Sequence, residues 1–249
     1  MLKRRLINVS LLVGLLIFWQ LLSIRGLPEF VLSPADIFVH FSTAVISGEL
    51  HHHIGASLVR SFPGFAIGTF LGIAFGLLAG VVRTFDQMLS PMIFLTYPVP
   101  KVVMLPIFMV WFGIGDLSKI LIIALGCFYP AFINAYYGAK ATPTILVWSG
   151  LNMGARQWQI FWKVVVPSAL PLIFAGIRVS LALSFIVMFA AEMINARSGL
   201  GYLIKQAEGN LRFDLMYVSI LAIAILGYLS DQVVRATRKR VVAWHEQSA

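Results

Sequence analysis

Residues 63–82 read PGFAIGTFLGIAFGLLAGVV, an uncharged run that decides the class of the fold. A hydrocarbon core about 30 Å thick takes roughly 20 apolar residues in a helix, so this run predicts a membrane-spanning helix. Similar runs predict further spans at residues 7–22, 88–112, 117–137, 170–194 and 215–233. Because these runs lack the short alternating pattern of a membrane barrel, we expect an all-α, polytopic membrane protein with about six transmembrane helices.

The composition of the whole chain agrees with this class. The chain has 249 residues, is 59% hydrophobic and 12% charged, and has a mean hydropathy of +0.89. A net charge of +9 would favour nucleic acid as a partner of a soluble protein, but here the basic residues gather at the two ends and in alternate loops. This bias predicts that both termini and the loop around Trp148 lie in the cytoplasm. The single cysteine, Cys127, excludes an intrachain disulfide.

One glycine every fourth residue marks the run quoted above: Gly64, Gly68, Gly72, Gly76 and Gly80. These positions share one helix face, so another backbone can approach that face closely. The stripe predicts a helix-packing surface. A surface for sliding during a conformational change is the alternative.

The third predicted span is interrupted near its middle by Tyr97, Pro98, Pro100 and Lys101. Prolines remove backbone donors, and a membrane tolerates the break only where the freed carbonyls meet protein or water. We therefore predict that these four residues line a pathway. Lys101 either attracts anions there or marks a helix end.

Two charges, Arg178 and Glu192, lie within the fifth predicted span, about 21 Å apart along a helix and too far to pair. Each needs a partner on another helix or a water-filled cavity. Structural ion pairing is our first interpretation and a place in the pathway the second. Asp116 and Lys119, at the start of the fourth span, are expected to form either a local pair or a helix N-cap, with Asp116 at the positive end of the helix.

A polar loop separates the fourth and fifth spans and contains WSGLNMGARQWQIFWKVVVPSALP, residues 148–171. The apolar residues of this loop are spaced as on an amphipathic helix, which predicts a cytoplasmic helix presented to a partner. The alternative is a helix lying on lipid, anchored by Trp158, Trp162 and Lys163.

Short motifs follow one another in a fixed order from about residue 27 to residue 236. They are Leu27-Pro28, Leu32-Ser33-Pro34, Ala56-Ser57-Leu58-x-Arg60, Pro98-Val99-Pro100, Leu105-Pro106, Trp111 to Asp116, Ser118-Lys119, Gly154, Pro167, Ala169-Leu170-Pro171, Gly176-x-Arg178, Ala191-Glu192 and Gly199-Leu200-Gly201. In this order they resemble the permease subunits of ATP-binding-cassette (ABC) importers for taurine, aliphatic sulfonates, nitrate and related small nutrients.

The resemblance implies the type I ABC-importer permease fold, a homodimer with the translocation path between its two copies, and a small organic or inorganic anion as solute. It also implies two cytoplasmic ATPase subunits, which would bind the ATP and magnesium, and a substrate-binding protein on the outer face. No cofactor is expected in this chain, and the localisation implied is the bacterial inner membrane.

The spacing from Gly154 to Pro167 resembles the coupling loop of these permeases, where a short helix docks in a cleft of the ATPase. The resemblance places Ala155, Gln157, Trp158 and Phe161 in or near that cleft. One departure stands out: Trp148, Ser149 and Gly150 occupy the positions of a consensus glutamate and two alanines. This departure indicates either a rearranged ATPase contact or a non-transporting paralogue.

The expected organisation is an N-terminal transmembrane helix (1–26), an outer segment with amphipathic helices (27–62), a permease core (63–236) with its coupling loop (143–169), and a cytoplasmic tail (237–249). The chain lacks the phosphate-binding and nucleophile motifs of enzymes, so we predict no catalytic residues. Three adjacent histidines, His51 to His53, do not share a helix face and predict no metal site. The main alternative function is a secondary transporter driven by an ion gradient, for which Glu192 is the one candidate acid.

Overall fold

The computed structural model describes residues 2–24, 26, 28 and 30–243. Leu27 of the first motif and residues 244–249 of the predicted tail lie outside the described residues. The described part is helical throughout, with short connections. Its elements are α1 (Leu2–Ile24), α2 (Pro34–Ile46), α3 (Glu49–Val81), α4 (Arg83–Thr96), η1 (Lys101–Met104), α5 (Leu105–Phe112), α6 (Asp116–Lys140), α7 (Thr144–Asn152), α8 (Gln157–Ile160), η2 (Phe161–Val165), α9 (Val166–Asn195), α10 (Leu200–Gly209) and α11 (Phe213–Val241).

The spans confirm a multi-pass helical protein, although the count differs from the six predicted. Within the described residues, four helical stretches are long and apolar enough to cross a membrane: α3, α6, α8 to α9 taken together, and α11. The pair α4 and η1–α5 would be a fifth, but it is bent by 93°. The first predicted span lies on α1, where Val13–Ile24 forms a shorter apolar helix. The predicted break in the third span is therefore confirmed.

The second span begins earlier than predicted. Helix α3 starts at Glu49 and runs for 33 residues, so residues 49–62, expected in the outer segment, belong to the same continuous helix. Pro63 does not end it, because hydrogen bonds on either side of the missing donor hold the helix together. Arg60, which lies within the predicted outer segment (27–62), is thus a buried residue of α3.

The glycine stripe of α3 faces α6 along its whole length. A Cβ atom added at Gly68 would lie 2.1 Å from the carbonyl oxygen of Ala124, and one at Gly76 would lie 2.4 Å from that of Phe132. Gly64, Gly72 and Gly80 meet α6 just as closely. The two backbones therefore touch where any side chain would hold them apart, which is a main source of attraction between helices in lipid.

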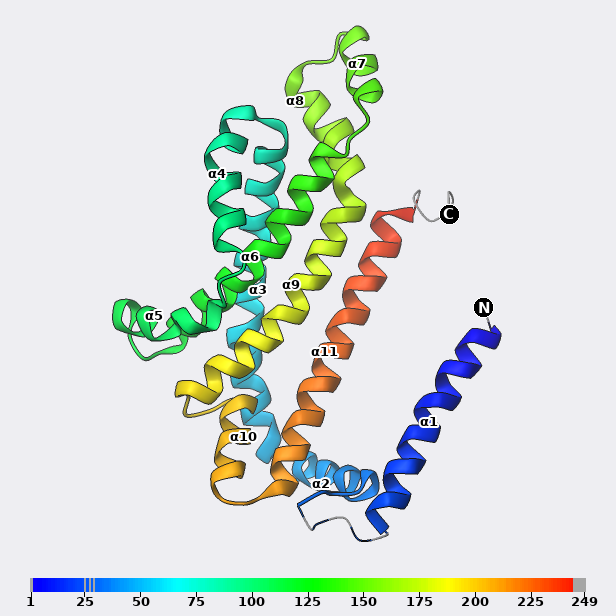
Figure 1. The fold of residues 1–249 in the computed structure, drawn as a ribbon, viewed down its shortest axis with the longest axis vertical. Helices are drawn as coiled ribbons and strands as arrows, with labels where there is room; N and C mark the ends of the chain where they lie inside the picture. The colour runs from blue at the N-terminus through cyan, green and yellow to red at the C-terminus, as the bar shows by residue number, and fades with distance from the viewer. Residues whose placement is uncertain (1, 25, 27, 29, 244–249) are drawn as a thin grey trace.

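The long helices α3, α6, α9 and α11 run side by side along the longest axis of the molecule (Figure 1). Helix α4 turns back along α3, whereas α2 lies across the lower end and α1 stands apart beyond α11 (Figure 1). The largest buried cluster joins α5, α6 and α9 through Leu105, Ile122, Cys127, Phe185 and Met188. Helices α7 and α8 project at the opposite end from α10 (Figure 1).

The close contact between the glycine stripe and α6 predicts that a larger side chain in the stripe lowers stability. We expect Gly68→Ala to lower the free energy of unfolding in detergent by about 1–3 kcal/mol, because the new methyl group collides with the backbone of α6. Gly55→Ala, on the same helix but with open space around it, is the matched control and should leave stability unchanged or slightly raised. Equal effects of the two substitutions would contradict the packing role of the stripe.

Candidate functional site

The loop between α6 and α9 folds as two short helices joined by a sharp turn. Helix α7 ends at Asn152, and Gly154 adopts φ +82°, a left-handed conformation that favours glycine. The N–H of Ala155 then donates to the carbonyl of Gly150 at 3.0 Å, which closes the turn. The prediction of one amphipathic helix through this segment was therefore wrong, because Gly154 reverses the chain between Leu151 and Ile160.

The two helices of the loop leave large apolar side chains exposed. Trp148, Met153 and Trp158 are 63%, 87% and 62% exposed. Gln157 is exposed as well, whereas Ala155 and Phe161 are half-buried and pack toward the cluster around Ala139 and Ile160. A notch of about 380 Å³ opens in the angle of the loop. It is lined by Gly150, Met153, Gly154, Ala155, Gln159 and Lys163, among others.

The loop is joined rigidly to the fifth span. Helix α8, the wide π-helical turn η2 and α9 form one uninterrupted helix from Gln157 to Asn195. Pro167 lies in the first turn of α9, directly after the π-helical turn. A proline collides with the carbonyl four residues earlier in a regular α-helix, and the wider turn relieves this collision. A displacement at Trp158 is thus carried into the membrane through a continuous helix.

The break in the third span is closed by a lysine. The Lys101 Nζ donates to the carbonyls of Thr96 at 2.6 Å, Val99 at 2.8 Å and Tyr97 at 3.1 Å. The same nitrogen lies 3.9 Å from the centre of the Tyr129 ring. In a continuing helix the Thr96 carbonyl would accept from residue 100, but Pro100 has no N–H. Lys101 therefore supplies the Thr96 carbonyl with the donor that Pro100 lacks, as expected for a lysine at a helix end. Tyr97, Pro98 and Pro100 remain exposed.

Glu192 lies at the centre of a buried polar cluster near the lower end of the molecule. Its carboxylate is inaccessible to solvent and accepts hydrogen bonds from Ser57 Oγ at 2.9 Å, Arg60 Nη1 at 2.7 Å and the N–H of Gly201 at 3.0 Å. Arg60 also donates through Nε to Asp116 at 2.6 Å and through Nη1 to the Ser198 carbonyl at 2.6 Å. These bonds connect α3, α6, α9 and the start of α10.

The cluster around Glu192 accounts for the motifs at Ser57 to Arg60 and at Gly199 to Gly201, and it gives Asp116 a partner other than the predicted one. Gly199 has φ +116°, and a Cβ atom there would lie 2.3 Å from the Glu192 carboxylate, so only glycine fits this position. Asp116 pairs with Arg60 and not with Lys119 as predicted, because the buried Lys119 Nζ turns back to the Gly115 carbonyl at 3.0 Å. Ser57 and Arg60, which the sequence analysis noted only as part of a motif, are the partners that complete the cluster.

Arg178 lies on the same helix as Glu192 but in a separate ion pair. Its Nε donates to Asp231 Oδ1 on α11 at 2.6 Å, and Arg235 Nε lies 2.7 Å from the other oxygen of the same carboxylate. The structure thus gives Arg178 and Glu192 partners on two different helices and does not bring the two residues together. Among the described residues, Lys101 contacts Thr96, Tyr97, Val99 and Tyr129 but forms no hydrogen bond or ion pair with Arg178 or Glu192, so no such bond joins the three charged pathway candidates.

Comparison with known proteins agrees with this architecture. Residues 68–243 match the family described as binding-protein-dependent transport system inner membrane component. The chain is 32% identical to the taurine transport system permease protein TauC of Escherichia coli (strain K12), over 95% of this chain and 88% of that protein. It is also 32% identical to the riboflavin transport system permease protein RibX of Chloroflexus aurantiacus, over 94% of this chain and 88% of that protein.

A second pair of matches extends the comparison. The chain is 32% identical to a protein of Bacillus subtilis (strain 168) named as the aliphatic sulfonates transport permease SsuC, over 91% of this chain and 83% of that protein. Among solved structures, a chain of the MetNI methionine ABC transporter in an inward-facing conformation matches with a TM-score of 0.67 at 22% identity. The match covers 76% of this chain and 94% of that chain. This last likeness shows a shared fold.

Several membrane-spanning helices, a broken span and a projecting loop rigidly joined to one span define the membrane-embedded subunit of a transport system. The chain belongs to the family of binding-protein-dependent transport system inner membrane components, and it is a permease subunit of an ABC importer.

A substitution at Glu192 tests the buried polar cluster. We expect Glu192→Gln to lower the free energy of unfolding by about 3 kcal/mol or more, because Arg60 then loses a buried charged partner. Thermal unfolding in detergent measures the loss, and Glu208→Gln, at an exposed position of α10, should change stability by less than about 0.5 kcal/mol. If the two variants unfold alike, the carboxylate of Glu192 does not hold the helices together.

Lys101→Met should loosen the bend, since three carbonyls lose their charged donor. We expect faster hydrogen exchange in residues 97–104, measured by mass spectrometry in detergent, and partial protection in Lys101→Arg. Lys205→Met, at an exposed position of α10, serves as the control for loss of a lysine. Unchanged exchange in Lys101→Met would show that the prolines alone fix the bend.

Proposed function

We propose that this chain forms, as a homodimer, the translocation pathway of an importer for a small anion such as a sulfonate, and that α7 and the turn at Gly154 dock on an ATPase subunit. The observation that carries the proposal is the projecting loop, with exposed Trp148, Met153 and Trp158 at one end of an uninterrupted 39-residue helix. A cytoplasmic surface of this kind converts a displacement of a bound partner into a movement of the fifth span.

The chemistry of the loop supports a protein partner over lipid. Its notch combines the left-handed turn at Gly154 with the polar side chains of Gln159 and Lys163. Trp158 and Trp162 are exposed on α8 and η2, whereas Trp148 and Met153 are exposed on α7 and the turn after it. Helix α7 extends beyond the ends of α4 and α11 (Figure 1). Where importers of this type carry a glutamate, this chain presents Trp148, so its contact with the ATPase would rest on apolar burial at that position.

Exposed apolar residues in the segment that follows the break support the homodimer. Val103, Val110, Trp111 and Ile114 are each between 68% and 83% exposed on one short, bent stretch. Bilayer lipid can cover such side chains, but the backbone of a broken span needs protein or water beside it. A second copy of the chain, related by a twofold axis, would provide that cover and place Tyr97, Pro98 and Pro100 along the path.

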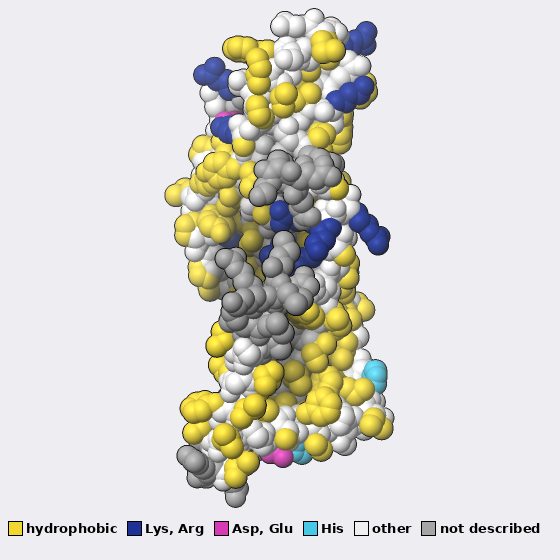
Figure 2. Space-filling view, turned by 90° about the vertical axis from the view of Figure 1, so that its right-hand side faces the viewer, with side chains coloured by type: hydrophobic (Ala, Val, Ile, Leu, Met, Phe, Trp, Pro, Cys, Tyr) yellow, Lys and Arg dark blue, Asp and Glu magenta, His cyan; other side chains and the backbone are white. Residues whose placement is uncertain are grey.

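Relatives named for sulfonates and taurine motivate the choice of solute. A substrate-binding protein would deliver the solute at the end of the molecule that carries α2 and α10. ATP and magnesium would bind the ATPase subunits. Basic side chains gather in the upper half of the face shown in Figure 2, and hydrophobic side chains cover its lower half. This distribution supports a cytoplasmic location of both termini in the bacterial inner membrane.

The test is co-purification of the tagged chain from its native membranes, with identification and stoichiometry of every partner. We expect two copies of the chain with two copies of an ATPase. The double variant Gly154→Asp, Ala155→Asp should lose the ATPase at least tenfold, because two charges enter the notch. The matched control, Gly209→Asp with Asn210→Asp at the end of α10, adds the same charge and should keep the ATPase.

Both variants must insert and unfold at the same temperature as the unaltered chain. Retention of the ATPase by the loop variant would refute docking at this loop. If the intact chain is isolated without any ATPase, the importer assembly proposed here is wrong, and uptake driven by an ion gradient becomes the leading alternative.

A further inference from the structure

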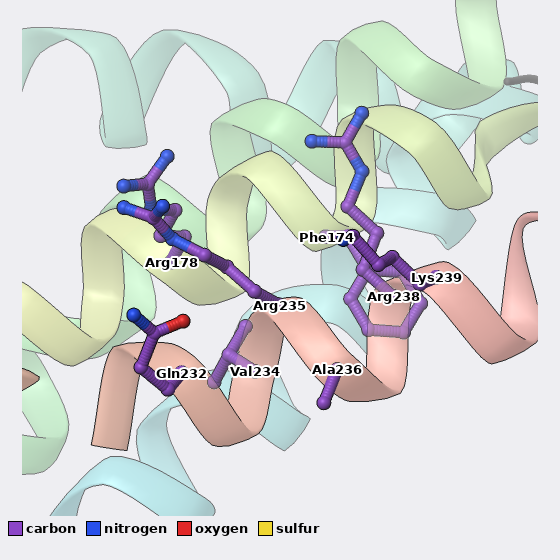
Figure 3. A pocket seen from close by; sticks show the side chains of 8 residues that line it. All are labelled: Phe174, Arg178, Gln232, Val234, Arg235, Ala236, Arg238 and Lys239. Atoms are coloured by element: carbon purple, nitrogen blue, oxygen red, sulfur yellow. The ribbon is translucent and has the colours of Figure 1, made fainter. Parts of the chain in front are cut away.

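A cavity of about 530 Å³ lies between α9 and the last turns of α11 (Figure 3). Four cationic side chains line it: Arg178 from α9, and Arg235, Arg238 and Lys239 from α11. In Figure 3 the side chains of Arg178 and Arg235 extend toward one another from the two helices. The cavity is separate from the loop at Gly154 and from the cluster around Glu192.

The charges around the cavity do not balance. Asp231 is shared between Arg178 and Arg235, with one carboxylate oxygen within 2.7 Å of each Nε. Within the described residues, Arg238 and Lys239 have no carboxylate partner. Four cations against one carboxylate leave about three positive charges at the rim of one cavity, so an anion would be attracted there.

The arrangement of donors suits an oxyanion with several oxygens. Arg235 contacts Asp231 through Nε, and its two terminal nitrogens make no hydrogen bond with the described residues. A guanidinium offers paired donors that match the oxygens of a phosphate, and a lysine adds a mobile point charge. Gln232, also on the wall of the cavity, offers an amide that can donate to the same group.

The other walls of the cavity are apolar. Phe174 and Val234 line it together with the cations. One to three turns earlier on α11, Tyr228, Leu229 and Val233 are 61%, 54% and 66% exposed, as expected for a surface that faces acyl chains. The cationic cavity thus lies where the apolar part of α11 ends, at the level of lipid headgroups.

We propose that the cavity formed by Arg178, Arg235, Arg238 and Lys239 binds a phosphate group, and that an anionic phospholipid headgroup supplies it. Basic clusters directly beside the cytoplasmic end of a membrane helix attract anionic lipids. A bound headgroup would bridge α9 and α11, which are otherwise joined here by apolar packing around Val234 and, among the described residues, by the ion pair of Asp231 with Arg178. The site does not depend on the solute or on ATPase docking, and only requires that the chain lie in a membrane.

The experiment uses the full chain, purified in mild detergent, stripped of lipid and assayed without ATPase or solute. Phosphatidylglycerol, phosphatidylcholine and inorganic phosphate are added separately at constant ionic strength. Native mass spectrometry counts bound lipid, and the unfolding temperature reports stabilisation. We expect one phosphatidylglycerol per chain with a raised unfolding temperature, and neither effect with phosphatidylcholine or phosphate.

The variant Arg238→Gln, Lys239→Gln should bind phosphatidylglycerol at least tenfold more weakly, while its unfolding temperature without lipid stays unchanged, because neither side chain has a carboxylate partner within the described residues. Arg83→Gln with Lys205→Gln removes the same charges from exposed positions elsewhere and should bind normally. Equal loss in the two variants would show general surface attraction and overturn the site. Equal stabilisation by inorganic phosphate would overturn the lipid as its source, and binding of phosphatidylcholine or of no lipid would overturn the proposal.

Discussion

The buried carboxylate of Glu192 is the constraint on which the end of this permease that carries α10 depends. A charge without access to water is tolerated only when several donors surround it, and here Ser57, Arg60 and the N–H of Gly201 do so. These donors come from different helices, so satisfying one carboxylate fixes α3, α9 and α10 relative to each other, and Asp116 extends the cluster to α6. Gly199 is then required because no side chain fits beside the carboxylate.

The opposite end of the molecule, which carries α7 and α8, exposes large side chains instead of burying them. There Trp148 of α7 and Trp158 of α8 are exposed, and α8 continues without a break into α9. Between the two ends, Lys101 donates to the Thr96 carbonyl, which Pro100 leaves without its helical donor, and to the carbonyls of Tyr97 and Val99, so the bend of the third span is a defined corner rather than a loose segment. A buried polar cluster at one end, a defined corner in the third span and an exposed loop joined to a continuous helix at the other end suit a protein that moves in response to a partner.

Much of this plan could be predicted from the sequence. The bilayer imposes a length on each span, prolines mark the break at residues 98–100, and the four-residue spacing of glycines marks a packing face. The sequence did not reveal that the stripe meets α6, or that Arg60 pairs with Glu192, because both contacts join residues far apart in the chain. Gly154 was visible as a turn residue, but the apolar spacing around it suggested one helix. The carbonyls that Lys101 reaches belong to a local geometry that no residue pattern specifies.

The contact between α3 and α6 also limits which parts of the permease can move. Each glycine of the stripe lies against a carbonyl or a methyl group of α6, and every residue between the glycines carries a side chain. Turning α3 about its own axis by one residue, about 100°, would bring a residue with a side chain into a space that admits only a hydrogen atom. The two helices therefore translate and tilt as one rigid body. The movements that open and close the path must therefore occur elsewhere, at the less extensive helix contacts around α11 and the bent third span.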